Sequence, residues 1–238
     1  MRTSRIVSLA LLVFVGLGAA APGQETVHFE SADGFRLEGS LWSNDSGPGV
    51  LLLHQCNNQR TMYDELAAQL AGEGFKVLTV DFRGFGGSRT DDLDAAVPEQ
   101  RMQAMRSVDA DGEAAYSFLA SQGSGSVAGA LGASCGGFAV VSLGQAHEEL
   151  VRMGFFSSGL SAERERDVLK LQGRQYLLIA ARDDRGAARA AGTIAYRVGR
   201  DRSELLLYEG DAHGAPLFDQ DPELVGKMVE FFKPLLEP

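Results

Sequence analysis

The hydrophobic pattern of the chain predicts strands of two kinds. Two β-type segments come first, at 26–29 and 35–42, and Asp33-Gly34 between them predicts the tight turn of a hairpin. Further along, short continuous apolar runs begin, and such runs are typical of strands buried on both faces. Further strands are expected at 50–53, 76–80, 126–131, 151–156, 176–180 and 204–208.

Segments whose apolar residues recur at helical spacing lie between these strands. Gly74 marks the end of one of them, and Pro98 stands at the start of the longest one. Helices are expected at 62–72, 98–121, 138–146, 187–196 and 224–236. Strands that alternate with helices predict an α/β fold, with a mostly parallel central sheet flanked by helices. In such open sheets, ligands bind beyond the carboxyl ends of the strands.

The first residues have the pattern of an export signal, so they are not expected to form part of the folded domain. Arg2 and Arg5 are followed by an apolar run at 6–15 and by small residues at 16–21. This order is that of a secretory signal peptide, and the apolar run is shorter than the ~20 residues of a membrane span. We therefore expect residues 1–21 to be removed, with cleavage near 19–21. The mature protein is then periplasmic or secreted, without a membrane anchor.

Composition and charge narrow the classes of function. The 238 residues, 45% of them hydrophobic and 23% charged, fit a single globular domain, expected over 22–238. The formal net charge of −10 becomes −12 when Arg2 and Arg5 are removed. An acidic surface without a basic stripe repels phosphate backbones, so nucleic acid is not an expected partner. Two cysteines, Cys56 and Cys135, are too few for a disulfide framework or a cysteine-based zinc site.

The strongest chemical signal is Gly132-Ala133-Ser134-Cys135-Gly136-Gly137, between an expected strand and an expected helix. It matches G-x-S-x-G, the nucleophile elbow, in which small neighbours permit a sharp turn that exposes a serine hydroxyl. A hydroxyl there lies at a helix N-terminus, where developing negative charge is stabilised. Cys135 is the rival nucleophile, because Ala133 and Gly137 flank it at the same spacing and a thiol is intrinsically more reactive. Glycine on both sides of the serine favours Ser134.

A serine nucleophile needs a base, and the chain offers four histidines. His28 lies within the first strand, and His147 lies near a helix end, where a solvent-exposed capping role is expected. His54 directly follows a strand, where it is expected to organise the loop. His213 lies in the loop 210–214, between the last strand and the closing helix, and it is the expected base.

The expected acid of the triad is one of two adjacent aspartates. Asp183 and Asp184 follow the strand expected at 176–180 and precede His213, which gives the order serine, acid, histidine. A carboxylate here would hold the imidazole in the right tautomer and stabilise the imidazolium. Adjacent side chains point in different directions. Asp184 is preferred, with Asp183 then serving as a turn or helix-cap residue, and Asp183 stays the alternative.

Acyl transfer also needs two backbone N–H groups directed at the developing oxyanion. Cys135, the residue after the nucleophile, supplies one, and the loop after His54 supplies the other from Cys56, with Gln55 as the alternative. The two cysteines thus fall on loops that must approach each other. In an exported protein they can form a disulfide, and two free thiols are the alternative, because the bond needs Cα atoms within ~7 Å.

These motifs resemble those of α/β-hydrolases, and among them the small members related to dienelactone hydrolases and esterases. The resemblance implies an α/β-hydrolase fold and a triad hydrolase without a metal or an organic cofactor. The chain departs from the family in having His54-Gln55 where many relatives have His-Gly, and Ser134 where dienelactone hydrolases proper have cysteine. The resembling segments follow the family's order along nearly the whole mature chain, at 53–55, 81–88, 132–137, 180–184 and 210–214.

The expected function is hydrolysis of small-molecule esters through an acyl-enzyme. The short segment 157–168 leaves no room for a large lid domain, and a compact, open site suits small or short-chain carboxylic esters or lactones. A peptidase or an acyltransferase on the same triad is the alternative among enzymes. A hydrolase-like scaffold that binds without turnover is the alternative outside them.

Overall fold

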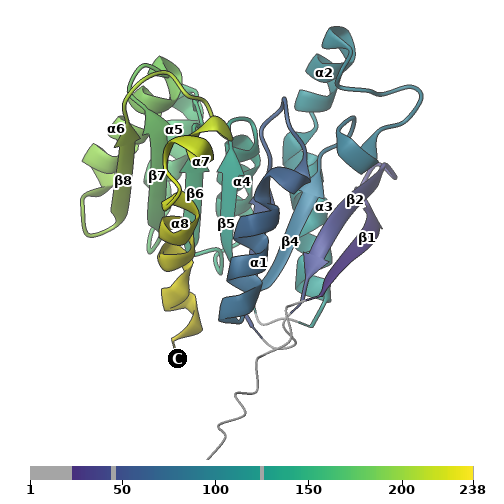
Figure 1. The fold of residues 1–238 in the computed structure, drawn as a ribbon, viewed down its shortest axis with the longest axis horizontal. Coiled ribbons are helices and arrows are strands. Elements are labelled where there is room, and N and C mark those ends of the chain that lie inside the picture. The colour runs from purple at the N-terminus through teal and green to yellow at the C-terminus, as the bar shows by residue number, and fades with distance from the viewer. Residues whose placement is uncertain (1–22, 44–46, 124–125, 238) are drawn as a thin grey trace, which may run out of the picture.

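Eight strands form one central sheet in the computed structural model, which describes residues 23–43, 47–123 and 126–237 (Figure 1). The expected signal peptide, 1–21, lies outside the described residues. The spatial order of the strands is β1-β2-β4-β3-β5-β6-β7-β8. The strands are β1 (Gln24–Glu30), β2 (Arg36–Trp42), β3 (Gly49–Leu53), β4 (Lys76–Asp81), β5 (Val127–Ala133), β6 (Arg152–Phe156), β7 (Gln175–Ala181) and β8 (Ser203–Tyr208).

The sheet is mostly parallel, as the sequence predicted. β1 pairs antiparallel with β2 as the expected hairpin, and β2 pairs antiparallel with β4. Gly34 in the hairpin turn has a φ of 79°, a conformation that glycine adopts without strain. All pairs from β4 to β8 are parallel, so β3, β4, β5, β6, β7 and β8 end at the same edge of the sheet.

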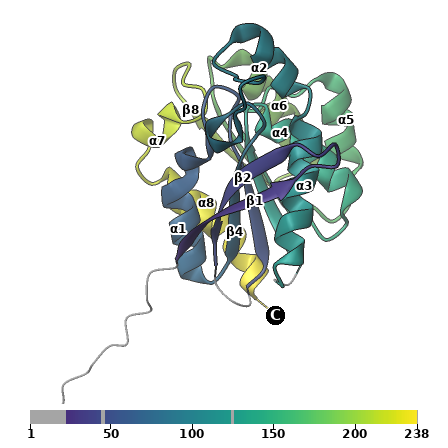
Figure 2. The ribbon, with the colours of Figure 1, turned by 90° about the vertical axis from the view of Figure 1, so that its right-hand side faces the viewer.

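Helices cover both faces of the sheet (Figures 1 and 2). α1 and α8 pack on one face with the cluster that includes Val50 and Leu52, and α3 to α6 pack on the other. The helices are α1 (Asp64–Glu73), α2 (Pro98–Met105), α3 (Val108–Ser121), α4 (Gly136–Ala146), α5 (Ala162–Lys170), α6 (Arg185–Val198), α7 (Pro216–Gln220) and α8 (Leu224–Phe232), with short 3-10 turns at Arg60–Tyr63, Gly86–Ser88 and Lys233–Leu236.

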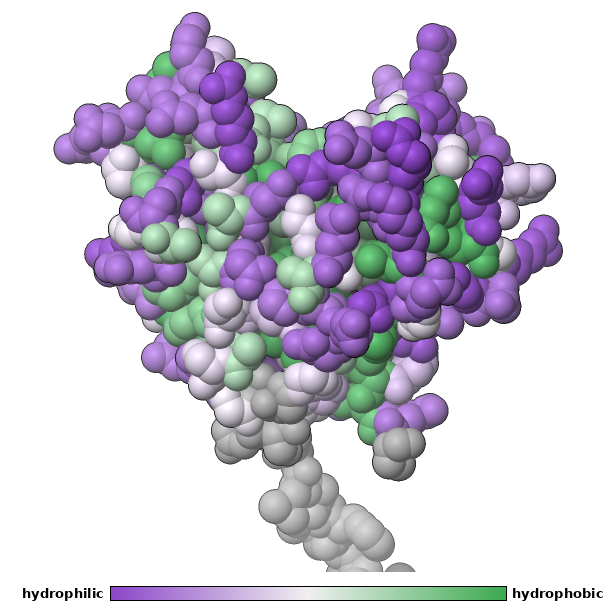
Figure 3. All heavy atoms as spheres, turned by 180° about the vertical axis from the view of Figure 1, so that it is seen from behind, coloured by the Kyte–Doolittle hydropathy of each residue, from purple (hydrophilic) through white to green (hydrophobic). Residues whose placement is uncertain are grey.

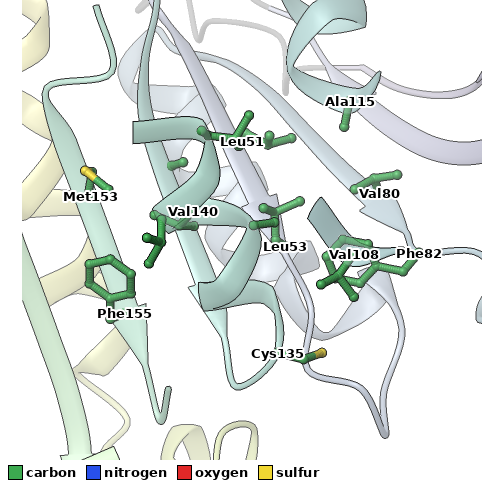
Figure 4. Close-up of a cluster of buried hydrophobic side chains, with 14 of the residues drawn as sticks. Leu51, Leu53, Val80, Phe82, Val108, Ala115, Cys135, Val140, Met153 and Phe155 are labelled. Carbon is green, nitrogen blue, oxygen red and sulfur yellow. The ribbon is translucent and has the colours of Figure 1, made fainter. Parts of the chain in front are cut away.

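β3 shows why its sequence is apolar without interruption. Leu51 and Leu53 point into the cluster beneath α3 to α6, where Figure 4 shows them beside Val140 of α4. Val50 and Leu52 point into the opposite cluster beneath α1 and α8. Because successive side chains of a strand face opposite sides, a strand covered on both faces needs an apolar residue at every position.

The expected helix over 98–121 is wrong as one element, because it is two helices, α2 and α3, separated at Arg106 and Ser107. Ser107 has φ −106° and ψ 2°, outside the helical range. In α2 only Ala104 is buried, whereas α3 buries a face against α4, so the two segments follow different surfaces. The closing helix ends at Phe232, four residues earlier than expected at 236, and Pro234 stands in the 3-10 turn that follows.

Two helices were not predicted, α5 and α7. α5 is a polar helix that buries only Glu165 and Val168, so its sequence holds few apolar residues to mark it. Its N-terminus is capped by the Ser161 hydroxyl, which accepts a hydrogen bond from the Arg164 amide at 3.3 Å. Over the described residues, the segment after β6 forms this single helix and no large lid, as expected. Within the same residues, every helix is too short or too polar to cross a membrane.

Candidate active site

Ser134 lies on a strained turn between β5 and α4, where its φ is 50°. Close packing explains the glycines on either side of it. A Cβ on Gly132 would lie 2.3 Å from the carbonyl of Gly136, and a Cβ on Gly136 would lie 2.4 Å from the carbonyl oxygen of Leu53. The G-x-S-x-G pattern is therefore a steric requirement of this turn.

Cys135, the rival nucleophile, is bonded to Cys56 in a disulfide, with Cα atoms 5.8 Å apart. Figure 4 shows Cys135 at the turn that follows β5. The bond joins the elbow to the loop after β3. The sequence left a disulfide and two free thiols as alternatives, and the structure contains the disulfide. A disulfide sulfur is not a thiolate nucleophile, which leaves the Ser134 hydroxyl as the candidate at the elbow.

Side chains from three strand ends meet at one point. The Oγ atom of Ser134 lies 2.9 Å from Nε2 of His213, and Nδ1 of His213 lies 2.7 Å from Oδ2 of Asp184. Ser134 follows β5, Asp184 follows β7 and His213 follows β8. The Asp184 side chain is 16% exposed and that of His213 is 41% exposed. An imidazole that donates Nδ1–H to a carboxylate has Nε2 free to accept the serine proton.

Asp183 does not join this arrangement. Its side chain is exposed, and within the described residues only its backbone groups are bonded, through the Gly210 carbonyl and the Arg185 amide. Of the two local roles expected for Asp183, the structure has the turn: Asp183 lies in the turn after β7, and Asp184 occupies the N-cap of α6. The Asp184 carboxylate makes no capping bond there, and it is bonded to His213 instead.

His28 and His147 lie elsewhere and bond to carboxylates. His28 on β1 pairs with Glu38 at 3.1 Å, and His147 at the end of α4 lies 2.9 Å from Glu113. The expected exposed cap at His147 is only partly right, because its imidazole stacks on Tyr116 with ring centroids 3.7 Å apart and is about one-fifth exposed.

His54 is fully buried, and both ring nitrogens are bonded. Nδ1 donates to the Gln55 carbonyl at 2.8 Å, and Nε2 accepts from the Phe82 amide at 3.0 Å, so the ring is neutral. Burial is the main cause that lowers the pKa of His54 to about 4. His54 thus holds the loop after β3 against the loop after β4, which agrees with its expected loop-organising role.

The backbone amides expected to form an oxyanion hole come from residues joined by the disulfide. Over the described part of the chain, the amides of Cys56 and Cys135 donate to no protein acceptor, which leaves them available to a ligand. Over the same residues, the amide of Gln55, the alternative second donor, likewise donates to no protein acceptor. The carbonyl of Gln55 accepts from the Asn57 and Asn58 amides at 2.9 and 3.0 Å, which fixes the path of this loop.

Two side chains that hold the histidine loop were missed in the sequence. Gln55 Oε1 accepts from the Ala215 amide at 2.8 Å, although Gln55 was considered only for its backbone. Ser157 Oγ accepts from the Gly214 amide at 2.9 Å. Ser157 ends β6 as Ser134 ends β5, and its φ is 48°, but no glycine pattern surrounds it. Its position after an apolar strand was the one available signal.

Two hollows flank the loop that carries Cys56. One, of about 570 Å³, is lined by His213 together with apolar side chains that include Pro216 and Phe218. The other, of about 350 Å³, lies on the side of Phe85 and is lined by Arg89 and Arg101. Asn57 and Asn58 line both of them. α2 lies at the upper edge of Figure 1, and seen from behind this edge is hollowed between two hydrophilic rises (Figure 3).

Comparison with solved structures supports the fold over nearly the whole chain. A Pyrococcus furiosus esterase is 16% identical, with a TM-score of 0.67 over 90% of this chain and 93% of that chain. A dienelactone hydrolase-like promiscuous phosphotriesterase from metagenomic libraries is 20% identical, with a TM-score of 0.69 over 91% and 99%. A cold-adapted esterase from an Arctic intertidal metagenomic library is 22% identical, with a TM-score of 0.66 over 91% and 95%.

Comparison of the sequence with known proteins and family models identifies the family. Two uncharacterized proteins from strains of Mycobacterium tuberculosis are each 41% identical over 70 residues, which is 28% of this chain. The match spans only 25% of the length of these curated relatives. The family model described as serine aminopeptidase, S33, matches residues 47–174, more than half of the chain. This protein therefore belongs to the serine aminopeptidase S33 family, within the α/β-hydrolases.

Proposed function

We propose that this protein is a serine hydrolase that cleaves small or short-chain carboxylic esters, or lactones, through an acyl-enzyme. The observation that carries the proposal is the hydrogen-bonded row Ser134–His213–Asp184, with distances of 2.9 and 2.7 Å. Such a row supplies a nucleophile, a base and a carboxylate that orients the base. Membership of a hydrolase family supports hydrolysis, and the esterases of similar fold favour an ester as the bond cleaved.

In the proposed reaction, Ser134 Oγ attacks the carbonyl carbon of the ester while Nε2 of His213 takes the hydroxyl proton. The carbonyl electron pair moves onto oxygen, where the Cys135 amide and one amide of the loop after β3 stabilise the negative charge. Collapse breaks the bond to the alcohol, which leaves with the proton from His213. A water molecule then attacks the acyl-enzyme in the same way, and release of the carboxylic acid restores Ser134. Asp184 stays ionised throughout and stabilises the imidazolium.

The proposed size of the substrate follows from the hollow that His213 lines. Its apolar lining is limited to Met62, Ala215, Pro216 and Phe218, and polar side chains such as those of Asn57, Asn58 and Asp219 make up the rest. Long acyl chains need an extended apolar groove, since each buried methylene contributes about 0.8 kcal/mol only where it leaves water. A short acyl group such as acetyl or butyryl fits the amount of apolar surface available.

Peptide-bond cleavage is the second candidate, because the matching family model is described as serine aminopeptidase. The same Ser134–His213–Asp184 row would serve an amide, whose leaving amine needs the proton from His213 even more than an alcohol does.

We also propose that the protein acts outside the cytoplasm. The order of basic, apolar and small segments in residues 1–21 supports export, and the disulfide between Cys56 and Cys135 suits an oxidising compartment. Expression of the full chain in a bacterial host, followed by N-terminal sequencing of the periplasmic fraction, tests this. We expect a new N-terminus near 19–21, whereas an uncleaved chain that stays in the cytoplasm would refute export.

The proposed activity is tested with p-nitrophenyl acetate, butyrate and palmitate, and with L-alanine p-nitroanilide, on the mature protein and on Ser134→Ala. We expect kcat/KM for acetate or butyrate to exceed that for palmitate at least ~10-fold, and kcat in Ser134→Ala to fall at least ~10⁴-fold. Faster turnover of the anilide than of every ester would make the protein a peptidase. Absence of turnover on all four substrates would contradict a hydrolase of small esters and favour a binding scaffold.

A further inference from the structure

Both peptide N–H groups that follow His213 donate to buried side chains from other parts of the chain. The Gly214 amide donates to Ser157 Oγ at 2.9 Å, and the Ala215 amide donates to Gln55 Oε1 at 2.8 Å. Ser157 is fully buried, and Gln55 is 3% exposed. The backbone beside the imidazole is therefore fixed by two hydrogen bonds that the sheet itself does not provide.

Gln55 joins this histidine loop to the loop expected to hold the oxyanion. Its Nε2 donates to Asn57 Oδ1 at 2.6 Å, so both ends of the side-chain amide are bonded. Its carbonyl accepts from Nδ1 of the buried His54. Gly214 packs directly on Gln55, because a Cβ on Gly214 would lie 1.7 Å from Gln55 Oε1. The φ of Gly214 is 68°, a second reason for glycine at this position.

Ser157 provides the other support, from the end of β6. Its amide donates to the Ile179 carbonyl of β7 at 2.7 Å, so its backbone continues the sheet beyond β6. Its φ of 48° turns the hydroxyl toward the Gly214 amide. A serine in this strained conformation costs free energy, and such positions are held where the surrounding contacts over-determine them.

We propose that Gln55 and Ser157 are positioning residues that hold His213 in reach of Ser134 and fix its loop to the oxyanion loop. The proposal rests on the proposed function. The His213 side chain is 41% exposed, so walls of protein do not hold it on every side. Its place depends on the backbone that carries it and on its bonds to Ser134 and Asp184. A misplacement of about 1 Å in a catalytic group costs on the order of 10²-fold in rate.

The variants separate positioning from simple loss of structure. Gln55→Leu has a similar size but loses both hydrogen bonds, whereas Gln55→Glu keeps an acceptor for the Ala215 amide. Ser157→Gly removes the hydroxyl and keeps a residue that tolerates a φ of 48°. Gln69→Leu is the matched control, because Gln69 is exposed on α1 and bonds only to Glu65.

The experiment measures kcat and KM for p-nitrophenyl acetate and the thermal midpoint of every variant. We expect Gln55→Leu and Ser157→Gly to lower kcat roughly 10- to 100-fold with KM within about threefold. Gln55→Glu should restore at least a third of wild-type kcat, and Gln69→Leu should match the wild type. A glutamate at 55 lies in the hollow that His213 lines, where Asp219 is also present and Asp184 bonds to the ring. It should move the acid limb of kcat/KM to higher pH by roughly half a unit to one unit.

Three results would overturn the inference. Wild-type kcat in folded Gln55→Leu and Ser157→Gly is the first. The second is an equal loss of kcat in Gln55→Leu and Gln55→Glu, with the pH profile of Gln55→Glu unchanged from that of the wild type. If Gln55→Leu fails to fold, Ser157→Gly and Gln55→Glu decide by the same criteria. The third is a wild-type protein without ester or anilide turnover, which refutes the proposed function and the positioning role with it. The positioning role alone is refuted if the wild type is active, Ser134→Ala is inactive, and Gln55→Leu and Ser157→Gly keep wild-type kcat.

Discussion

At the scale of single residues, the site depends on two imidazoles in contrasting surroundings. His213 is partly exposed and has one nitrogen on a carboxylate and the other on a hydroxyl. His54 is buried, and both of its ring nitrogens bond to backbone groups, so neither nitrogen is free to accept a proton. Only the first arrangement suits proton transfer, whereas the second suits a neutral ring that joins two loops. The two adjacent aspartates also lie in contrasting surroundings, since the Asp184 carboxylate bonds to His213 and the Asp183 side chain is exposed.

Asp184→Asn is expected to lower kcat for p-nitrophenyl acetate by about 10³- to 10⁴-fold, because an amide stabilises the wrong tautomer of His213. Asp183→Asn is the matched control and should leave kcat within about twofold, since the Asp183 carboxylate does not contact His213. Steady-state kinetics of the two variants check this. Equal losses in both, or a larger loss in Asp183→Asn, would show that the acid is misassigned.

His54 is expected to make stability fall in mild acid. Because burial lowers its folded pKa from 6.5 to about 4, the unfolded chain binds the proton first as the pH decreases. The contribution of His54 is therefore complete above about pH 6.5 and is lost as the pH falls toward 4. Between pH 7 and pH 4.5 this loss amounts to about 2 kcal/mol.

Urea unfolding at both pH values measures this effect. His54→Gln, which lacks the titrating ring, should be less stable than the wild type at pH 7 but should lose about 2 kcal/mol less between the two pH values. An equal loss in the two proteins would contradict the assigned protonation of His54.

At the scale of elements, each proposed catalytic group lies in a loop that follows a parallel strand, and further contacts hold these loops together. The disulfide joins the loop after β3 to the elbow after β5. His54 joins the loops after β3 and β4 through the Phe82 amide, and Gln55 and Ser157 reach the loop after β8. The site is thus a set of loops bonded to one another, which is consistent with the positive φ of Ser134, Ser157 and Gly214 within it.

The disulfide is expected to contribute to stability and to catalysis. It closes a loop across a sequence separation of 79, for which the chain-entropy model gives about 4.5 kcal/mol at 25 °C. Replacing both cysteines, as Cys56→Ser with Cys135→Ser, should lower the free energy of unfolding by up to that amount. It should also lower kcat roughly tenfold, because the two oxyanion amides lose their mutual anchor.

Denaturant unfolding and ester kinetics on the double variant, with alkylation of the unreduced wild type, test this prediction. Two thiols that alkylate readily in the folded, unreduced wild-type protein would contradict it at once. Unchanged kcat in the double variant would limit the bond to a structural role.

The strands and the elbow could be predicted from the sequence where a single physical requirement determines the residue type. β3 and β7 were found because a strand covered on both faces must be apolar throughout, and the elbow was found because sterics demand Gly132 and Gly136. The break near Ser107 was missed because it follows tertiary surfaces, and the helix α5 was missed because it holds few apolar residues. Gln55 and Ser157 were missed as supports of His213, since their contacts span 160 and 57 residues. No local pattern reports contacts of that range.

At the scale of the whole molecule, the parallel part of one sheet gathers residues from distant segments at one edge. The family model covers 47–174, which includes Ser134 but ends before Asp184 and His213. Asp184 and His213 are linked to Ser134 by their order along the chain and by the two distances at His213. The chain is acidic, with a formal net charge of −10, and an acidic surface favours solubility and disfavours polyanionic partners.

Covalent labelling with a fluorophosphonate, read by intact mass and peptide mapping, tests the central claim most directly. The reagent reacts with a serine only where a base activates the hydroxyl. We predict one adduct per chain, on Ser134, with loss of ester hydrolysis in proportion to labelling and with no adduct in Ser134→Ala or His213→Ala. An adduct on another residue would contradict the account. So would ester hydrolysis that continues at the wild-type rate in Ser134→Ala.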